Sequence, residues 1–265
     1  MRFASALMAA MLLAGACSPD PGGTGSAQDG AAAQAAVSTP IFPRLPRQRI
    51  VLMSSLPLVY GDGIDMAGRI AGKSRPHPLY SAMAQGHDLV VADVLDAQAL
   101  SGAGMMILVQ PRALTPQEFV AIDDFVRAGG RLLLFADPML EWSGHAGLGD
   151  PAGPLRSALV SPLLAHWGIE LIDPQIESVR TGDAGGLLVH PGKFAELPGK
   201  IGDASCRIAE HGLIARCAVG EGRALLVADA DLLDPALISD SGESGRANRK
   251  MVHDLIRELT MNDTS

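Results

Sequence analysis

The sequence predicts a three-layer α/β fold, in which helices cover both faces of a mostly parallel sheet. Short apolar runs typical of buried strands alternate with segments of helical spacing. The clearest unit is residues 105–136, where a strand, a capped helix and a second strand follow one another. Such a βαβ unit is right-handed, so its two strands should lie parallel in one sheet. Only 4% of the residues are aromatic, so the core must consist mainly of Val, Leu, Ile and Ala.

The α/β domain is expected to occupy residues 47–262. Apolar runs rich in β-formers predict its first strands at residues 49–55, 87–94 and 105–111. A short helix is expected at residues 76–85, between the first two strands.

The best-defined helix begins after Thr115. Thr115 at the N-cap and Glu118 three residues later form a capping box, and Pro116 suits the first helical position. Gly129 is expected in the left-handed conformation that commonly ends a helix. Residues 131–136 are continuously apolar after the first, which is typical of a strand covered on both faces.

The rest of the domain contains a second strand that ends in an acid and a closing amphipathic helix. In order, we expect a loop at 139–154, a helix at 155–168 interrupted at Pro162, a small β-rich insertion at 169–219, a strand at 222–229 and a helix at 246–260. The closing helix has an apolar stripe at helical spacing, formed by Met251, Val252, Leu255, Ile256 and Leu259.

The N-terminus predicts export and a lipid anchor. Residues 1–16 combine one Arg with a short apolar run, as a signal peptide does. The tetrapeptide AGAC, which ends at Cys17, resembles the lipobox of bacterial lipoproteins, so Cys17 would carry the lipid; cleavage by an ordinary signal peptidase is the alternative. Residues 17–46 read as a flexible linker. The protein would then face the periplasm, and Ser18 after the Cys favours the outer membrane over the inner one.

Two further cysteines, Cys206 and Cys217, flank a segment that reads as a hairpin turning near His211 and Gly212. Pairing across that turn places them opposite each other. Because an exported protein meets an oxidising compartment, a disulfide is expected, with two free buried thiols as the alternative.

Two acids end the apolar strands, and they are the first candidates for a site. Asp137 and Asp229 would lie at the carboxyl edge of the sheet, where α/β proteins bind ligands. As a close pair they could bind a cation or share a proton; the alternative, which we favour, is that each shapes the following turn. Gln110 and Arg112 belong to the turn after residues 105–109 and should border the same crevice, with Arg112 as the best candidate for holding an anionic ligand.

The sequence gives little support for a catalytic nucleophile, a metal or cofactor site, or nucleic-acid binding. The turn after residues 105–109 has no Cys or Ser nucleophile, and GxSxG, HExxH, CxxC and Walker motifs are absent. The seven histidines are scattered without metal-ligand spacing, so we predict no metal and no cofactor. The net charge of −8, with no basic patch in the sequence, predicts no nucleic-acid partner.

Two stretches, ILVQPRALTPQEFVAIDDFVRAGGRLLLFADP and GEGRALLVADADLLD with ANRKMVHDLIREL, resemble an uncharacterised ABC-transporter-associated domain of gliding-motility-type auxiliary components. The resemblance implies a flavodoxin-like or glutamine-amidotransferase-like fold without the catalytic apparatus of those enzymes. It also implies an ABC transporter permease or another envelope protein as partner. Members of that family often have transmembrane helices, whereas this chain has an anchor signal instead.

Together these features predict an exported, lipid-anchored, non-enzymatic accessory protein of an ABC-type envelope transport system. It would attach to the lipid bilayer through Cys17 and bind a partner protein or a small ligand at the carboxyl edge of the sheet. The alternative is an envelope hydrolase that acts on a sugar or peptide through Asp137 and Asp229.

Overall fold

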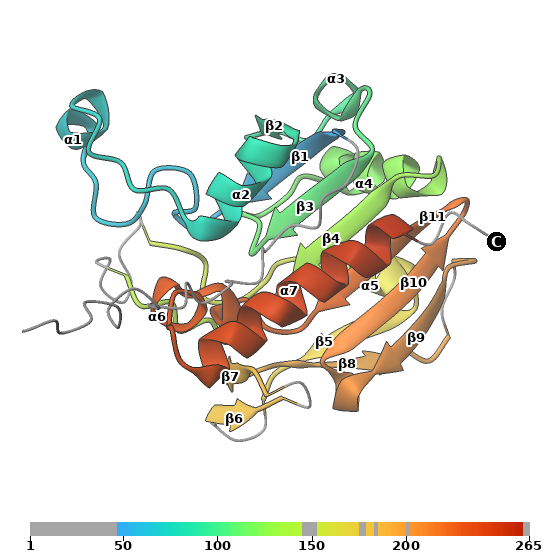
Figure 1. Ribbon diagram of the computed structural model, residues 1–265. Helices are drawn as coiled ribbons and strands as arrows, with labels where there is room; N and C mark the ends of the chain where they lie inside the picture. Colours follow the sequence, from blue (N-terminus) through green and yellow to red (C-terminus); the bar gives the residue numbers. More distant parts are fainter. Residues whose placement is uncertain (1–46, 145–152, 175–178, 183–184, 200–201, 262–265) are drawn as a thin grey trace, which may run out of the picture. The chain divides into compact units, whose positions relative to one another are not determined.

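The computed structural model describes residues 47–144, 153–174, 179–182, 185–199 and 202–261. The predicted signal peptide, the lipidation site at Cys17 and the linker lie outside the described residues. A seven-stranded sheet forms the centre of the domain (Figure 1). Its strands, in spatial order, are β2 (Asp88–Val91), β1 (Arg49–Ser54), β3 (Met105–Val109), β4 (Arg131–Phe135), β11 (Gly222–Val227), β10 (Ile214–Val219) and β9 (Ser205–Ala209).

The first five strands of this order are parallel, and β10 and β9 extend the sheet in antiparallel pairing. Two small antiparallel sheets lie beside the main one. One pairs β5 (Ile169–Ile172) with β8 (Lys193–Glu196), and the other pairs β6 (Val179–Thr181) with β7 (Leu187–Val189).

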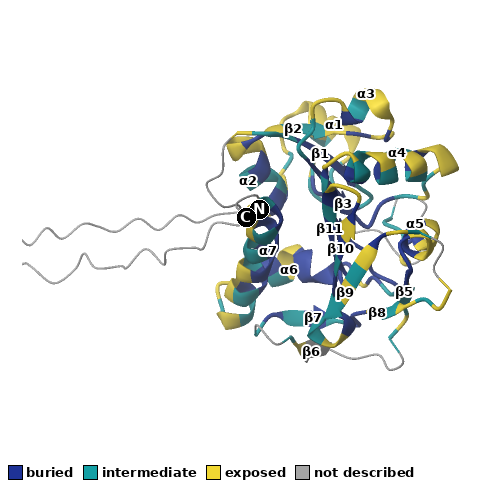
Figure 2. Cartoon of the chain, turned by 90° about the vertical axis from the view of Figure 1, so that its right-hand side faces the viewer, coloured by how far each residue is buried: buried dark blue, intermediate teal, exposed yellow. Residues whose placement is uncertain are grey.

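Helices cover both faces of the main sheet, as predicted (Figure 2). The described helices are α1 (Met66–Ile70), α2 (Pro78–Gly86), α3 (Ala97–Leu100), α4 (Pro116–Arg127), α5 (Ser161–His166), α6 (Pro235–Ile238) and α7 (Glu243–Met261), with short 3₁₀ turns at Glu210–Gly212 and Asp231–Leu233. The apolar sides of α2 and α7 pack on one face, and those of α4 and α5 on the other. The three-layer α/β prediction is therefore confirmed.

Local chemistry explains helix α4. The Thr115 hydroxyl accepts a hydrogen bond from the Glu118 amide at 3.3 Å, and a Glu118 carboxylate oxygen accepts one from the Thr115 amide at 2.9 Å. This reciprocal arrangement satisfies two amides that the first turn leaves without intrahelical partners. Gly129 has a φ of 98°, which most residues avoid, so the helix ends where the sequence predicts.

The structure differs from the prediction in two segments. Strands β9 and β10 belong to the main sheet, so the part of residues 169–219 that lies outside it ends before Ser205. Alternate residues of these two strands, such as Ile208 and Ala215, turn one apolar face to the core on one side of the sheet, and this favours their addition to it, with β10 beside β11 and β9 beside β10. Helix α5 begins at Ser161 with Pro162 in its first turn, where a missing amide costs nothing.

A disulfide joins Cys206 and Cys217, which are directly opposite each other in the register of β9 and β10. The hairpin turns through Glu210, His211 and Gly212, all with positive φ. The predicted pairing across that turn is confirmed. Among the described residues, no helix combines the length and apolar character that a membrane span requires.

Replacing both cysteines by Ala should lower the free energy of unfolding by about 2–3 kcal/mol, because the bond closes a short loop in the unfolded chain. Urea unfolding of the oxidised wild type and of the double variant measures this difference. Wild type treated with a reductant is the matched control and should behave like the variant. Identical midpoints for oxidised and reduced wild type would contradict the prediction.

Candidate functional site

Three of the four predicted ligand-binding residues meet at the carboxyl edge of the main sheet. Gln110 follows β3, Asp137 follows β4 and Asp229 follows β11, and these three strands are neighbours in parallel register. All three side chains are fully buried. The juxtaposition expected from the sequence is therefore present, but beneath the surface.

Gln110 ties this edge together through its side-chain amide. Its Oε1 accepts a hydrogen bond from the Asp137 amide at 2.8 Å, and its Nε2 donates to the Asp137 carbonyl at 2.9 Å and to the Leu155 carbonyl at 3.0 Å. The backbone of Gln110 has a φ of 42°, a left-handed conformation that a non-glycine residue adopts at a cost. These three hydrogen bonds use both the oxygen and the nitrogen of the side-chain amide, and they hold Gln110 in that conformation.

Both carboxylate oxygens of Asp137 are occupied by backbone amides. Oδ1 accepts from Met139 at 2.8 Å and Oδ2 from Ala230 at 2.9 Å, which joins the ends of β4 and β11. Burial raises the pKa of Asp137 to about 6, and the amides of Ala230 and Met139 limit that rise by stabilising the charged form.

Asp229 is bound on one side only. Its Oδ1 accepts from the Leu232 amide at 2.8 Å, whereas Oδ2 has no hydrogen-bond partner among the described residues. Burial, followed by the charge of Asp137, raises the pKa of Asp229 well above its ordinary value. Asp229 therefore holds its proton much more tightly than an exposed aspartate does.

Two acids that the sequence analysis did not single out complete the cluster. Asp231 accepts from the Glu141 amide at 2.7 Å, and burial raises its pKa to about 7. Asp234 accepts from the amide and the hydroxyl of Ser143, each at 2.6 Å. The spacing of three aspartates in DADLLD after a strand was a signal for them, since each can bind amides of a turn or of a crossing loop.

The described part of the loop that follows β4, residues 138–144, lies against the acids and closes the edge. Leu140 and Trp142 are buried, and Arg156 donates to the Leu140 carbonyl at 2.9 Å. A hollow of about 60 Å³ remains beside Trp142, enough for one or two waters at roughly 30 Å³ each. Direct contact between a ligand and Gln110, Asp137 or Asp229 would require this loop to move.

Arg112, the fourth predicted ligand-binding residue, does not contact the buried acids and binds other residues instead. Its guanidinium donates to both Glu118 oxygens, at 2.6 and 3.1 Å, and to the carbonyls of Asp93 and Ala113. These contacts use all five of its N–H groups. Arg112 thus braces the capping box of α4, and an anionic ligand would have to displace Glu118 to bind it.

Replacing Arg112 by Ala should destabilise the protein by about 2 kcal/mol, because Glu118 is left buried without its cation. The Arg112 guanidinium is the main reason that the pKa of Glu118 is lowered to about 2 from 4.5. This pair stabilises the protein fully above pH 4.5 and is lost as the pH falls towards 2. The loss caused by Arg112→Ala, measured by urea unfolding, should therefore shrink between pH 5 and pH 2.5. The same loss at both pH values would contradict this account.

No group of three or more His, Cys, Asp or Glu side chains is arranged to hold a metal ion in the part of the chain that the structure describes. The buried acids instead bind amides of their own chain. The arrangement can hold the loop after β4 against the ends of β4 and β11, and it can keep protons on buried carboxyls.

Several solved structures show a distant likeness to this chain. The mmIFT52 N-terminal domain is 12% identical, with a TM-score of 0.47, and the match covers 81% of this chain and 99% of that one. Cytoplasmic protein STM1381 from Salmonella typhimurium LT2 is 12% identical, with a TM-score of 0.43 and 80% and 99% coverage. A β-galactosidase from Rahnella sp. R3 is 15% identical, with a TM-score of 0.39, and only 32% of that chain is covered against 81% of this one. No curated protein matches the chain.

A family model does match. The model described as ABC-type uncharacterized transport system covers residues 47–180, from the start of β1 into β6. This span contains β1 to β4 and the capped helix α4, the segment on which the resemblance in the sequence mainly rests. The chain belongs to the family of the ABC-type uncharacterized transport system, whose members are auxiliary proteins of such transporters.

Proposed function

We propose that this auxiliary protein is exported, anchored by a lipid on Cys17, and non-enzymatic, and that it acts by binding a partner protein of its transport system. The observation that carries the proposal is the closed carboxyl edge of the sheet. There the loop after β4 covers the buried acids, and backbone amides occupy most of their oxygens. A partner protein can use an external surface, whereas a small ligand would need this edge to open.

The same geometry weighs against the hydrolase alternative. General acid–base catalysis requires a carboxyl within hydrogen-bond reach of the substrate. Asp137 and Asp229 have no exposed surface, and both Asp137 oxygens are bound within the chain. A raised pKa at such a position follows from burial alone and does not require a catalytic role.

The anchor rests on the sequence. The apolar run before Cys17, the small residues at the cleavage position and the polar linker to residue 46 form the usual order of a bacterial lipoprotein. The linker would hold the domain on a flexible tether at its membrane, and Ser18 favours the outer membrane.

Two measurements on cells test the proposal. The first is fractionation of wild type and Cys17→Ser: wild type should be found with membranes, and the variant should be soluble in the periplasm. The second is co-purification of wild type with a tagged permease of its transport system. A soluble wild type would overturn the anchor. Failure to co-purify with the permease after crosslinking would overturn the partner assignment.

A further inference from the structure

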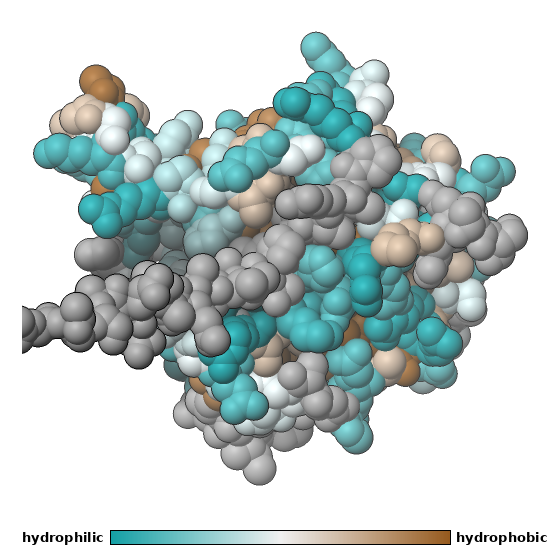
Figure 3. Space-filling view, viewed as in Figure 1, coloured by the Kyte–Doolittle hydropathy of each residue, from teal (hydrophilic) through white to brown (hydrophobic). Residues whose placement is uncertain are grey.

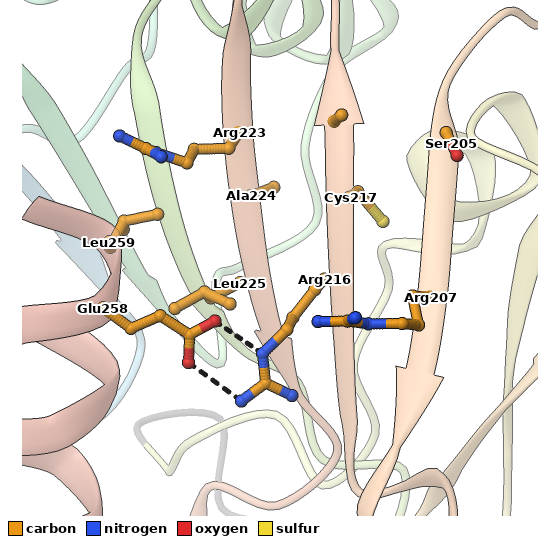
Figure 4. A pocket seen from close by; sticks show the side chains of 10 residues that line it. Ser205, Arg207, Arg216, Cys217, Arg223, Ala224, Leu225, Glu258 and Leu259 are labelled. Atoms are coloured by element: carbon orange, nitrogen blue, oxygen red, sulfur yellow. Dashed lines mark hydrogen bonds and ion pairs between the residues drawn. The ribbon is translucent and has the colours of Figure 1, made fainter. Parts of the chain in front are cut away.

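Arginines from three consecutive strands gather on one face of the main sheet. Arg207 on β9, Arg216 on β10 and Arg223 on β11 line one groove, shown in Figure 4. The pairing register places Arg207 directly opposite Arg216. The groove lies on the sheet face that carries α7, whose residues Glu258 and Leu259 form one of its walls.

The two opposed arginines differ in their partners. Arg216 binds Glu258 through two nearly parallel hydrogen bonds, Nε to Oε1 at 2.6 Å and Nη2 to Oε2 at 2.9 Å, and Glu210 lies 3.8 Å away. Arg207 is exposed and makes no ion pair with any residue that the structure describes. Like charges directly opposite in a sheet destabilise it, so an additional carboxylate between the two arginines would be favourable.

The groove has the size and lining of a binding site. Its volume is about 360 Å³, and the apolar side chains that line it on this face are those of Ala218, Leu225 and Leu259, whereas Cys217 and Ala224 turn their side chains to the opposite face. Ser205 adds a hydroxyl at the rim. Three arginines and Glu258 line the groove, and Glu210 lies 3.8 Å from Arg216, so positive charge gathers here although the whole chain has a net charge of −8. Because general attraction cannot draw an anion to an acidic protein, any affinity must come from this local arrangement.

We propose that this groove binds an acidic segment of a partner protein, with carboxylates of Asp or Glu held between Arg207 and Arg216 and next to Arg223. Arginine forks match carboxylates in two-point geometry, and the Arg216–Glu258 pair already shows this geometry in the groove. The apolar lining suits the methylene groups and apolar neighbours of acidic side chains in a peptide. A free inorganic anion would leave that lining exposed to water. The proposal rests on the proposed function for the existence of a partner.

The test is a titration of the full chain into a fluorescently labelled peptide of alternating Glu and Leu, followed by fluorescence anisotropy. The same peptide with Gln in place of Glu, and inorganic phosphate as a competitor, show which chemistry is recognised. The Glu peptide should bind at least tenfold more tightly than the Gln peptide, and its affinity should fall with added salt.

Three variants locate the binding. Arg207→Gln should weaken binding of the Glu peptide about tenfold. Arg257→Gln removes the same charge from the neighbouring position on α7, outside the groove, and should leave binding unchanged. Glu258→Gln should strengthen binding several-fold, because it releases Arg216 from its carboxylate inside the chain. Tighter binding by Glu258→Gln is not expected if Glu258 has a purely structural role. Thermal melts serve as the control that each variant is folded.

Several outcomes would overturn the proposal. They are equal losses in Arg207→Gln and Arg257→Gln, equal affinity for the Glu and Gln peptides, or phosphate competing as well as the Glu peptide on a molar basis. Failure of this groove is distinguishable from failure of the proposed function. If the groove is wrong, Arg207→Gln still co-purifies with the permease as wild type does. If the proposed function is wrong, wild type does not co-purify, whatever the peptide shows.

Discussion

Replacing Asp229 by Asn should make the protein more stable at neutral pH, although the residue is completely buried. Burial and the charge of Asp137 raise the pKa of Asp229 above its ordinary value of 3.8 in the unfolded chain. As the pH rises above about 4, the unfolded chain releases this proton and the folded protein keeps it, so the free energy of unfolding falls. Asn does not titrate in this range. The stability of the Asp229→Asn variant relative to wild type should therefore increase with pH, by at most ~1.4 kcal/mol per pH unit.

The geometry permits the replacement. Asn can still accept from the Leu232 amide through Oδ1, and no described hydrogen bond to Oδ2 is lost. Urea unfolding of both proteins from pH 4 to pH 8 measures the effect. Equal stability at pH 4 and a widening advantage of Asp229→Asn above it are expected.

Asp234→Asn is the matched control. Asp234 is also buried, but both of its oxygens accept hydrogen bonds, from Ser143 and from the Ala236 amide. An amide group must therefore face a backbone N–H, so this variant should lose about 1–3 kcal/mol. If Asp229→Asn also loses stability at pH 7, Asp229 is stabilised as a carboxylate and our account of the cluster is wrong.

The Asp229→Asn variant also tests the hydrolase alternative in cells. A binding protein should complement a deletion strain with Asp229→Asn as well as with wild type. A hydrolase that uses this carboxyl should lose its function, since general acid–base catalysis typically supplies about 10²–10⁴-fold in rate. A stable variant that does not complement would overturn the non-enzymatic proposal.

Gly222→Ala should unfold the protein or cost roughly 3 kcal/mol or more. A Cβ at this position would overlap the carbonyl oxygens of Val126 and Gly130, at the end of α4. The chain cannot move away cheaply, because Glu221 donates to the Arg127 carbonyl at 3.0 Å and Arg223 donates to the Gly130 carbonyl at 3.3 Å. The turn before β11 thus completes the end of α4, and an added methyl breaks these bonds or forces strain.

Gly86→Ala is the matched control for this prediction. Gly86 ends α2, and a Cβ there meets nothing within 4 Å. It should leave stability unchanged or raise it by about 0.4–1 kcal/mol. Circular dichroism and urea unfolding of both variants decide the matter. A loss below about 1 kcal/mol in Gly222→Ala would mean that α4 and the turn are not in close contact.

The elements that sequence reasoning predicted well are those specified by neighbouring residues. The capping box of Thr115 and Glu118 and the apolar runs of β3 and β4 need no knowledge of distant contacts. The disulfide register was predictable because a hairpin relates Cys206 to Cys217 locally. Asp137 and Asp229 were predictable neighbours because parallel strands end at one edge of a sheet.

What the sequence did not predict depends on contacts between distant segments. The bonds from Asp231 and Asp234 to Glu141 and Ser143 cross about 90 residues of chain. Arg207, Arg216 and Arg223 lie close together in the sequence, but only the pairing register of β9, β10 and β11 shows that they line one groove. Arg112 was predicted to be available to a ligand, but it binds Glu118, and the capping motif that predicts the role of Glu118 in the helix does not reveal this second contact.

The position of β11 between β4 and β10 has a consequence for synthesis of the chain. β4 is made early, but its neighbour β11 follows roughly 90 residues later. Until the ribosome has released β11, the apolar strand Arg131–Phe135 stands at the border of an incomplete sheet, open to pairing with another chain. The segment matched by the family model ends before β11 and should therefore aggregate when expressed alone. An exported chain kept unfolded until it has crossed the membrane would avoid this half-built state, because all of its strands become available together.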